Sequence, residues 1–183
     1  NSKGYIGAVS YRASEALLNY MEASYEFNGR NGTLDPLAEE YWKIIRRRAK
    51  VDDDVWKTIN NTDMSKEAVN DWGAYSGAEL VDKVLYNIRR ERRCELMFDN
   101  DNRYWDLIRW HQLDKLDTTK YPDIILGANV ANDMDGCEAN KVGKYIDGSK
   151  DGSRIYDKKH YLYPIPTGQI ALNPQLAPNN PGW

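Results

Sequence analysis

Charged and aromatic side chains crowd one short part of this sequence, between Ile88 and Trp110. These 23 residues hold six arginines, five carboxylates and three Trp or Tyr rings. Three kinds of chemistry suit such a set. Two carboxylates can flank a glycosidic bond, arginines can contact nucleic-acid phosphates, or arginines and carboxylates can pair between helices.

The balance of charge favours the pairing of arginines with carboxylates. A glycosidase needs one carboxyl group with a raised pKa, whereas an arginine beside a carboxyl group lowers it. A polyanion binder normally carries a basic excess, but this chain has a net charge of -3. We therefore predict a structural ion network and no nucleic-acid partner. The network would comprise Glu91, Arg92, Glu95, Arg103, Asp106 and Arg109, several of which fall on a helix stripe that should be buried.

Four helices are expected to position these side chains, at about 11–29, 35–50, 78–98 and 102–113. Asp35 suits an N-cap and Pro36 the first helical position. The first two helices would form an αα-hairpin of the tetratricopeptide kind. Their predicted buried stripes are Ala13, Ala16, Leu17, Tyr20, Met21 and Ser24 in the first helix, and Leu37, Tyr41, Ile44 and Ile45 in the second. The predicted fold is mainly α.

The segment 51–77 reads as a long loop with one helical turn near 65–69, because Asp, Asn, Ser and Gly dominate it. Its rings Trp56, Trp72 and Tyr75 are candidates for sugar stacking, or else they anchor the loop to the helices. Beyond Asp114 the sequence predicts a long irregular C-terminal region with little strand.

Composition restricts the class of protein further. The chain has 183 residues with 13 Tyr and 6 Trp but only 2 Phe, a balance that suits sugar-binding surfaces and protein interfaces. Its apolar runs are far shorter than the ~20 residues of a membrane-spanning helix. Cys94 lies in a helical pattern, where we expect a small buried thiol.

We predict no metal or cofactor, except for one candidate calcium site. Asp147, Ser149 and Asp151 are spaced like the first half of a calcium-binding loop, but Lys158 stands where such a loop has a glutamate. Simple Asp-Gly turns are the other interpretation.

Several motifs, in the right order, resemble the SusD/RagB family. The segment "RRERRCELMFDNDNRYWDLIRW" is similar to the family's paired ERRxEL and RyxDLxRW motifs. "YRASEALLNYMEASYE", "YWKIIRRRAKV" and "YLYPIPTGQIALNPQLAPNNPGW" resemble three further family segments, so that the likeness spans nearly the whole chain. "FDNDNR" departs from the usual FEGxR, which affects the geometry of the loop between the two motifs.

The resemblance implies a surface lipoprotein of the bacterial outer membrane that captures glycans or other nutrients without catalysis. Its expected partners are an oligosaccharide and a SusC-like TonB-dependent transporter. Relatives are about three times longer, so residues 1–183 are expected to form the C-terminal portion, with the lipidated cysteine and further helices upstream. Such a portion should expose apolar helix faces and behave poorly alone. Two alternatives stay open, a helical protein-interaction scaffold and a carbohydrate-active enzyme.

Overall fold

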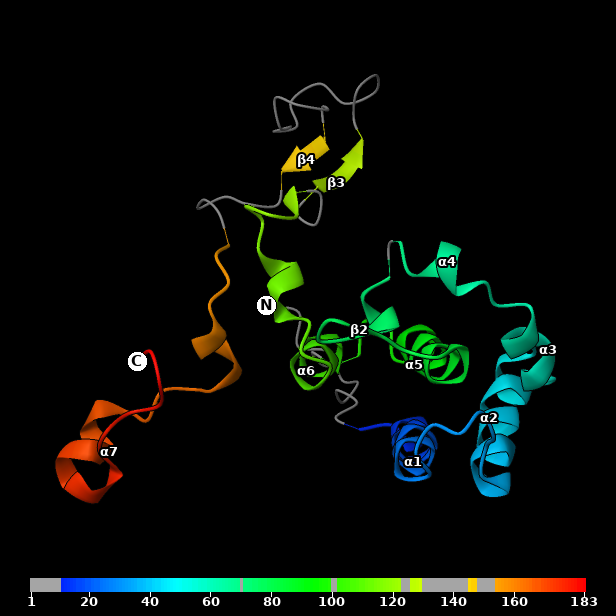
Figure 1. The fold of residues 1–183 in the computed structure, drawn as a ribbon, viewed down its shortest axis with the longest axis horizontal. Helices are drawn as coiled ribbons and strands as arrows, with labels where there is room; N and C mark the ends of the chain where they lie inside the picture. The colour runs from blue at the N-terminus through cyan, green and yellow to red at the C-terminus, as the bar shows by residue number, and fades with distance from the viewer. Residues whose placement is uncertain (1–10, 70, 100–101, 123–125, 130–144, 148–153) are drawn as a thin grey trace, which may run out of the picture. The chain divides into compact units, whose positions relative to one another are not determined.

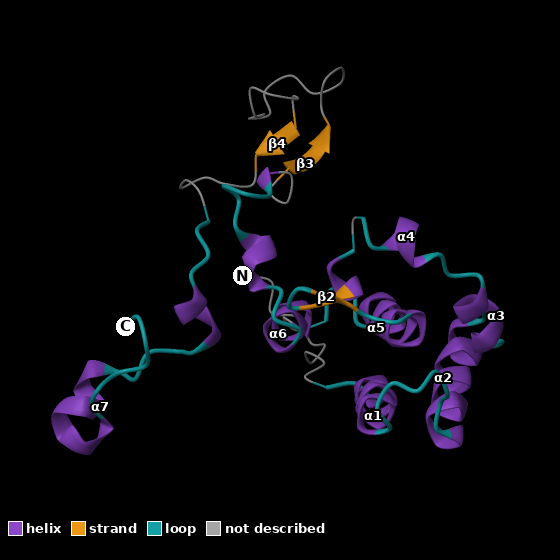
Figure 2. Cartoon of the chain, in the orientation of Figure 1, coloured by secondary structure: helices purple, strands orange, loops and turns teal. Residues whose placement is uncertain are grey.

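The computed structural model describes residues 11–69, 71–99, 102–122, 126–129, 145–147 and 154–183. The chain divides into two compact units, Asn1–Trp110 and His111–Trp183. The fold is mainly α-helical, which confirms the predicted class (Figures 1 and 2). The first unit contains α1 (Ala13–Phe27), α2 (Pro36–Ala49), α3 (Val55–Asn60), α4 (Met64–Glu67), η1 (Trp72–Ala74), β1 (Tyr75–Ser76), β2 (Glu79–Leu80), α5 (Lys83–Glu95) and α6 (Asn102–Arg109).

Helix α2 begins where the sequence predicts. The Asp35 side chain accepts hydrogen bonds from the backbone N–H groups of Leu37 and Ala38, and Pro36 occupies the first helical position. The helix ends at Lys50, which adopts a left-handed conformation with φ of 57°. A short loop joins α1 to α2, and the two helices pack together as the expected αα-hairpin.

The predicted buried stripes of α1 and α2 are right in part. Met21 and Ile45 lie in the core, and Leu17 and Tyr41 pack against it, whereas Ala13, Ala16, Tyr20, Leu37 and Ile44 are exposed. The buried residues are Leu18, Met21, Glu22 and Tyr25 in α1 and Ala38, Trp42, Ile45 and Arg46 in α2. The prediction missed the charged residues of the inward faces: Glu22 pairs with Arg89, and Arg46 pairs with Glu91, both partners lying on α5.

The segment 51–77 contains more regular structure than the expected loop. Helices α3 and α4, the turn η1 and the strand β1 occupy most of it. Its aspartates cap these short elements, because the side chains of Asp54, Asp63 and Asp71 each accept a backbone N–H bond at an element's start. The same polar residues that suggest a loop therefore begin new elements.

Helix α5 begins at Lys83, five residues later than expected, because the antiparallel pair β1–β2 precedes it. Gly77 makes the turn with φ of 58°. Cys94 lies near the end of α5 and is exposed, so the prediction of a buried thiol is wrong. The inward face of α5 carries Ile88, Arg89 and Arg92, and Cys94 points away from it.

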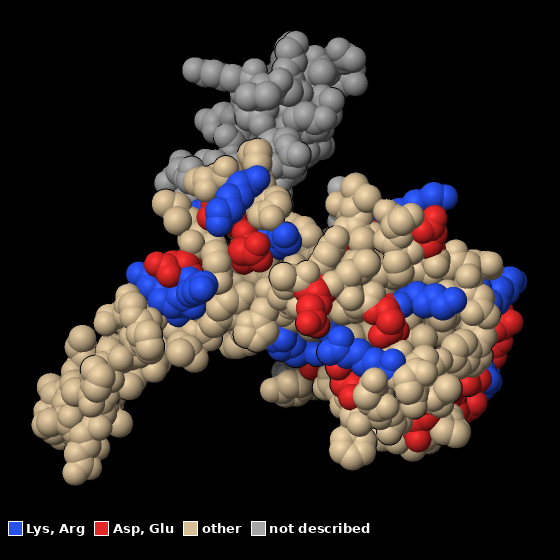
Figure 3. Space-filling model, in the orientation of Figure 1, with Lys and Arg blue, Asp and Glu red and all other residues tan. Residues whose placement is uncertain are grey.

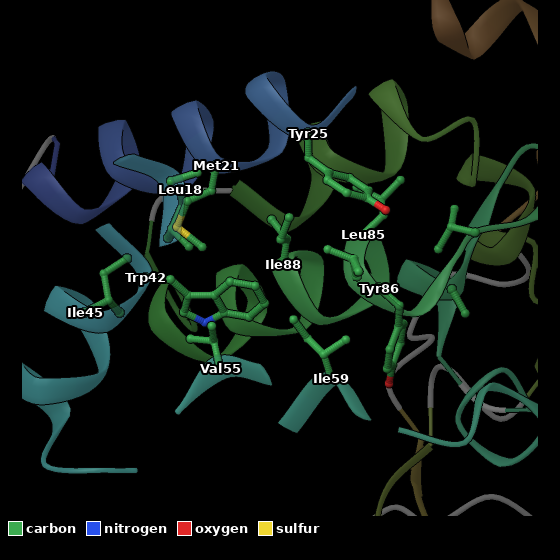
Figure 4. Packing of buried hydrophobic residues seen from close by; sticks show 14 of the residues in the cluster. Leu18, Met21, Tyr25, Trp42, Ile45, Val55, Ile59, Leu85, Tyr86 and Ile88 are labelled. Carbon is green, nitrogen blue, oxygen red and sulfur yellow. The ribbon is translucent and has the colours of Figure 1, made fainter. Parts of the chain in front are cut away.

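Side chains from four helices meet in the core of the first unit (Figure 4). Helix α5 lies against α1, α3 contacts both α2 and α5, and the indole of Trp42 is completely buried among them. The labelled core residues in the figure are Leu18, Met21, Tyr25, Trp42, Ile45, Val55, Ile59, Leu85, Tyr86 and Ile88. This core holds helix α5, which carries the first half of the charged motif.

The described residues of the second unit form short elements joined by irregular chain, as the sequence predicts. They are η2 (Leu113–Leu116), β3 (Leu126–Asn129), β4 (Tyr145–Asp147), η4 (Lys158–Tyr161), α7 (Thr167–Leu172) and η5 (Pro174–Leu176). Strands β3 and β4 form an antiparallel pair. The side chain of Asn179 bonds both the N–H and the C=O of Ile165, which fixes the local path of the C-terminal segment. Within the described residues, no helix has the length and apolar character needed to cross a bilayer.

Candidate functional site

The three rings proposed for sugar stacking occupy different elements of the first unit. Trp56 lies on α3, Trp72 in η1 and Tyr75 in β1. Trp56 packs at the edge of the hydrophobic core, and its indole Nε1 donates to Glu39 Oε2 at 3.0 Å. Tyr75 also packs against this core. Among the residues that the structure describes, no ring-to-ring contact joins the three.

These contacts anchor Trp56 and Tyr75 to the core, and sugar stacking on any of the three rings stays a prediction. Trp72 is half-buried and lies outside the hydrophobic cluster. Its neighbour Gly73 is buried, and the Asp71 side chain accepts the Gly73 N–H at 2.9 Å. The η1 turn that presents Trp72 is thus held firmly.

Arg92 and Asp106 form the centre of the predicted ion network. Arg92 Nε lies 2.9 Å from both oxygens of Asp106, and Arg92 Nη1 donates to Asn19 Oδ1 at 2.6 Å. Both charged side chains are almost fully buried. Arg109 adds a 3.0 Å contact to Asp106 Oδ1. These bonds connect α5, α6 and α1.

Glu91 and Glu95 lie on α5 but face other parts of the chain than α6. Glu91 Oε2 accepts from Trp42 Nε1 at 2.9 Å and from two nitrogens of Arg46 on α2. Glu95 accepts from Arg12 at 2.7 Å and from Arg48 at the end of α2. The network therefore ties α5 to the αα-hairpin as well as to α6, which is a wider role than the sequence suggests.

Arg103 differs from the other predicted members, because its one ion pair among the described residues is a long contact of 3.8 Å with Asp71. Its guanidinium lies over the Trp110 ring at 5.3 Å from the centroid. Arg89 and Arg109 lie over the same ring at 4.5 and 5.2 Å. Three cations thus surround one buried indole, an arrangement that cation–π attraction favours.

Glu22 balances part of this positive charge, although its position in the first helix gave no signal in the sequence. Its Oε1 accepts from Arg89 Nε at 3.1 Å and from Trp110 Nε1 at 2.9 Å, and its Oε2 accepts from Arg109 Nη2 at 2.6 Å. Burial acts to raise the pKa of Glu22, but the hydrogen bonds and charges of Arg109, Arg89 and Trp110 outweigh burial and lower the pKa.

The electrostatics of this cluster do not fit acid–base catalysis. A carboxyl group with a lowered pKa stays ionised near neutral pH and cannot serve there as a general acid. Burial lowers the pKa of Arg103, and burial likewise lowers that of Arg89 although Glu22 opposes the effect. The ion pairs of the motif hold helices together. Lys, Arg, Asp and Glu intermingle over the visible face of the first unit (Figure 3).

The proposed calcium loop lies largely outside the described residues. Asp147 ends strand β4, whereas Ser149 and Asp151 fall in the undescribed range 148–153. In the part of the chain that the structure covers, no three His, Cys, Asp or Glu side chains gather as a metal site would require.

Comparison with known proteins gives one match. The family model described as the SusD family matches residues 1–183 of this chain. No curated protein and no solved structure is similar enough to count as a match. The match covers the motif helices, the αα-hairpin and the irregular C-terminal region together.

Proposed function

Because this chain belongs to the SusD family, we propose that it is part of a protein that binds glycans or other nutrients at the bacterial outer-membrane surface without turning them over. The match over residues 1–183 is the observation that carries the proposal. The ion pairs support it, since Arg92 and Asp106 are buried and bonded to each other, and the pKa of Glu22, which bonds Arg109 and Trp110 of the motif, is lowered where a catalytic acid would need a raised one.

The proposal includes partners and an anchor. The bound oligosaccharide would pass to a SusC-like TonB-dependent transporter, and a lipid on a cysteine upstream of residue 1 would hold the protein to the membrane. The exposed Cys94 lies within α5, at the centre of the sequence, and is not that anchor.

A binding assay on the full-length protein tests this function. Calorimetry with a panel of neutral oligosaccharides built from glucose, xylose, mannose or galactose should give saturable binding for at least one of them. Chromatography of the same mixtures after long incubation should reveal no new products. New reducing ends would instead identify a carbohydrate-active enzyme, and a complete lack of glycan binding would favour a protein-interaction scaffold.

The Trp72→Ala variant tests one of the aromatic candidates. Loss of stacking on one ring should weaken glycan binding by about tenfold if this ring contacts the sugar, because an aromatic contact is worth roughly 1–1.5 kcal/mol. Trp56→Phe is the matched control, since it keeps the packing of a ring at the core edge. Equal affinities for wild type and Trp72→Ala would place the binding surface elsewhere.

A further inference from the structure

The first unit has a polar hollow on its surface, with a volume of about 460 Å³. This volume falls in the range of small-molecule sites, roughly 300–1,000 Å³. Helix α1 supplies one wall, β1 and α5 another, and the end of α6 the third. The lining residues are Asn19, Glu22, Ala23, Glu26, Ser76, Arg89, Arg109 and Trp110.

The floor of the hollow is rigid. Glu22 and Arg89 keep only 4% and 3% of their surface exposed, and they bond each other at 3.1 Å. Arg89 also donates to the Tyr75 carbonyl at 3.0 Å and to Ser76 Oγ at 2.9 Å. The Trp110 indole N–H also donates a hydrogen bond to Glu22. Such mutual bonding pre-organises the site, which lowers the entropy cost of binding.

The rim keeps hydrogen-bonding capacity that the floor does not use. The side-chain oxygen of Asn19 accepts a hydrogen bond from Arg92, and both amide N–H groups of Asn19 have no partner among the described residues. In the same described set, Arg109 Nη1 makes no hydrogen bond, and the Ser76 hydroxyl only accepts. Glu26 Oε1 has a distant contact of 3.7 Å to Arg89 and accepts no hydrogen bond from a described residue. Donor groups of three lining residues and one acceptor thus remain for a ligand.

The charges around the hollow cancel. Two carboxylates, Glu22 and Glu26, face two guanidinium groups, Arg89 and Arg109. A fixed anion or cation in the ligand would meet no excess of opposite charge here. A neutral ligand with many hydroxyl groups matches the mixture, because each hydroxyl both donates and accepts.

We propose that this hollow binds one neutral sugar residue of a glycan through its hydroxyl groups. The proposal rests on the glycan-binding function given above and assigns it a site in this chain. Stacking plays little part, since only 1% of Trp110 is exposed and three guanidinium groups cover its ring. Asn19, Glu26, Ser76 and Arg109 are the residues that contact the ligand.

Two variants test the rim and leave the bonds of Arg89 to Glu22, Tyr75 and Ser76 in place. Asn19→Asp keeps an oxygen for Arg92 but removes the amide donors, and Glu26→Ala removes the acceptor. Each should raise the dissociation constant of the bound glycan about 3–10-fold, the loss expected for one hydrogen bond. Glu40→Ala is the matched control, because Glu40 is also a surface glutamate on a helix with an arginine partner. The control should leave the affinity unchanged.

The measurement combines calorimetry with NMR on the full-length protein and the same oligosaccharide panel. The Trp110 indole N–H resonance should shift with ligand, because this group lies directly under the hollow. An oligogalacturonide, which is anionic, should bind more weakly than its neutral counterpart. Binding that neither rim variant weakens would overturn the site while the glycan-binding function stands. Absence of binding by wild-type protein to every glycan would overturn both.

Discussion

Asp106 is the residue on which two arginines of the motif converge. It accepts bonds from Arg92 on α5 and from Arg109 on its own helix, and only 3% of it is exposed. Asp106→Ala leaves buried positive charge uncompensated and should lower the free energy of unfolding by about 3–5 kcal/mol. Urea unfolding followed by circular dichroism measures this loss.

The exposed pair Arg47–Asp53 supplies the control for this experiment. Removal of its carboxylate in Asp53→Ala should change stability little, because water and salt screen exposed pairs. If the two substitutions had similar effects, the motif charges would not be the buried lattice that their geometry indicates.

Glu22 makes stability depend on pH. Its pKa in the folded protein is lowered, chiefly by Arg109 and Arg89 acting against the effect of burial. A carboxyl group with a lowered folded pKa binds protons less readily than in the unfolded chain. Its contribution is therefore present above the ordinary pKa of about 4.3 and disappears as the pH falls through the folded value.

Wild type and Glu22→Gln should accordingly differ most in free energy of unfolding at pH 7. The difference should shrink steadily as the pH is lowered below about 4. Urea titrations at several pH values, within the range where both proteins remain folded, measure it. A difference that is constant across this range would show that proton binding at Glu22 does not contribute.

At the scale of elements, Asp82 joins a helix cap to the core. Its Oδ1 accepts from the N–H groups of Val84 and Leu85 at the start of α5 and from the Tyr25 hydroxyl at 2.8 Å. Asp82→Ala should therefore cost about 2 kcal/mol, the sum of a lost cap and a lost buried bond. Asp63→Ala removes the cap of the short α4 together with exposed bonds to the Ser65 hydroxyl and Lys66, and it should lower the melting temperature less.

Thermal unfolding of Asp82→Ala and Asp63→Ala decides whether the hydrogen bond from the Tyr25 hydroxyl to Asp82 contributes to stability. A Tyr25→Phe variant should account for the part of the Asp82 effect that exceeds a simple cap. If Asp82→Ala and Asp63→Ala melt at the same temperature, the bond to α1 adds nothing.

The elements that the sequence predicts well are those with strong local signals. Asp35 and Pro36 give the start of α2 directly, and the arginine-rich motif predicts two helices in contact. The path of 51–77 could not be predicted because Asp54, Asp63 and Asp71 suit loops and helix caps equally well. The polar hollow could not be found either, since its residues come from α1, β1, α5 and α6, which only the tertiary fold brings together.

At the scale of the whole molecule, α1 and α2 are apolar on two sides. One side forms the core, and the other exposes apolar side chains. The exposed apolar side chains are Tyr20 and Phe27 on α1 and Leu37 and Ile44 on α2. The ring of Tyr20 contacts the ring of Tyr41 on α2. Helices with two apolar sides normally occupy a middle layer. This pattern fits the expectation that a longer protein covers the hairpin.

The C-terminal segment adds to the same argument. Residues 161–183 contain no Asp, Glu, Lys or Arg, although such residues make up 29% of the chain. The described stretch 154–183 holds no fully buried residue, and side chains such as Leu172 and Tyr163 are exposed. Asn179, Asn180 and Trp183 hold its shape through bonds to backbone carbonyl groups instead of a core. A stretch without charge that exposes apolar side chains is typical of an interface.

Residues 1–183 alone should consequently associate through exposed apolar side chains. The double variant Phe27→Ser and Ile44→Ser should stay monomeric at concentrations where wild-type residues 1–183 associate, as measured by light scattering. Its melting temperature should hardly change, because 91% of Phe27 and 43% of Ile44 are exposed. Ile45→Ser is the control one position along α2: Ile45 is only 2% exposed, so its loss should cost about 2 kcal/mol or more. If wild-type residues 1–183 stay monomeric at high concentration, the exposed apolar side chains of α1 and α2 do not need to be covered by other protein. The apolar second side of the hairpin would then require another explanation.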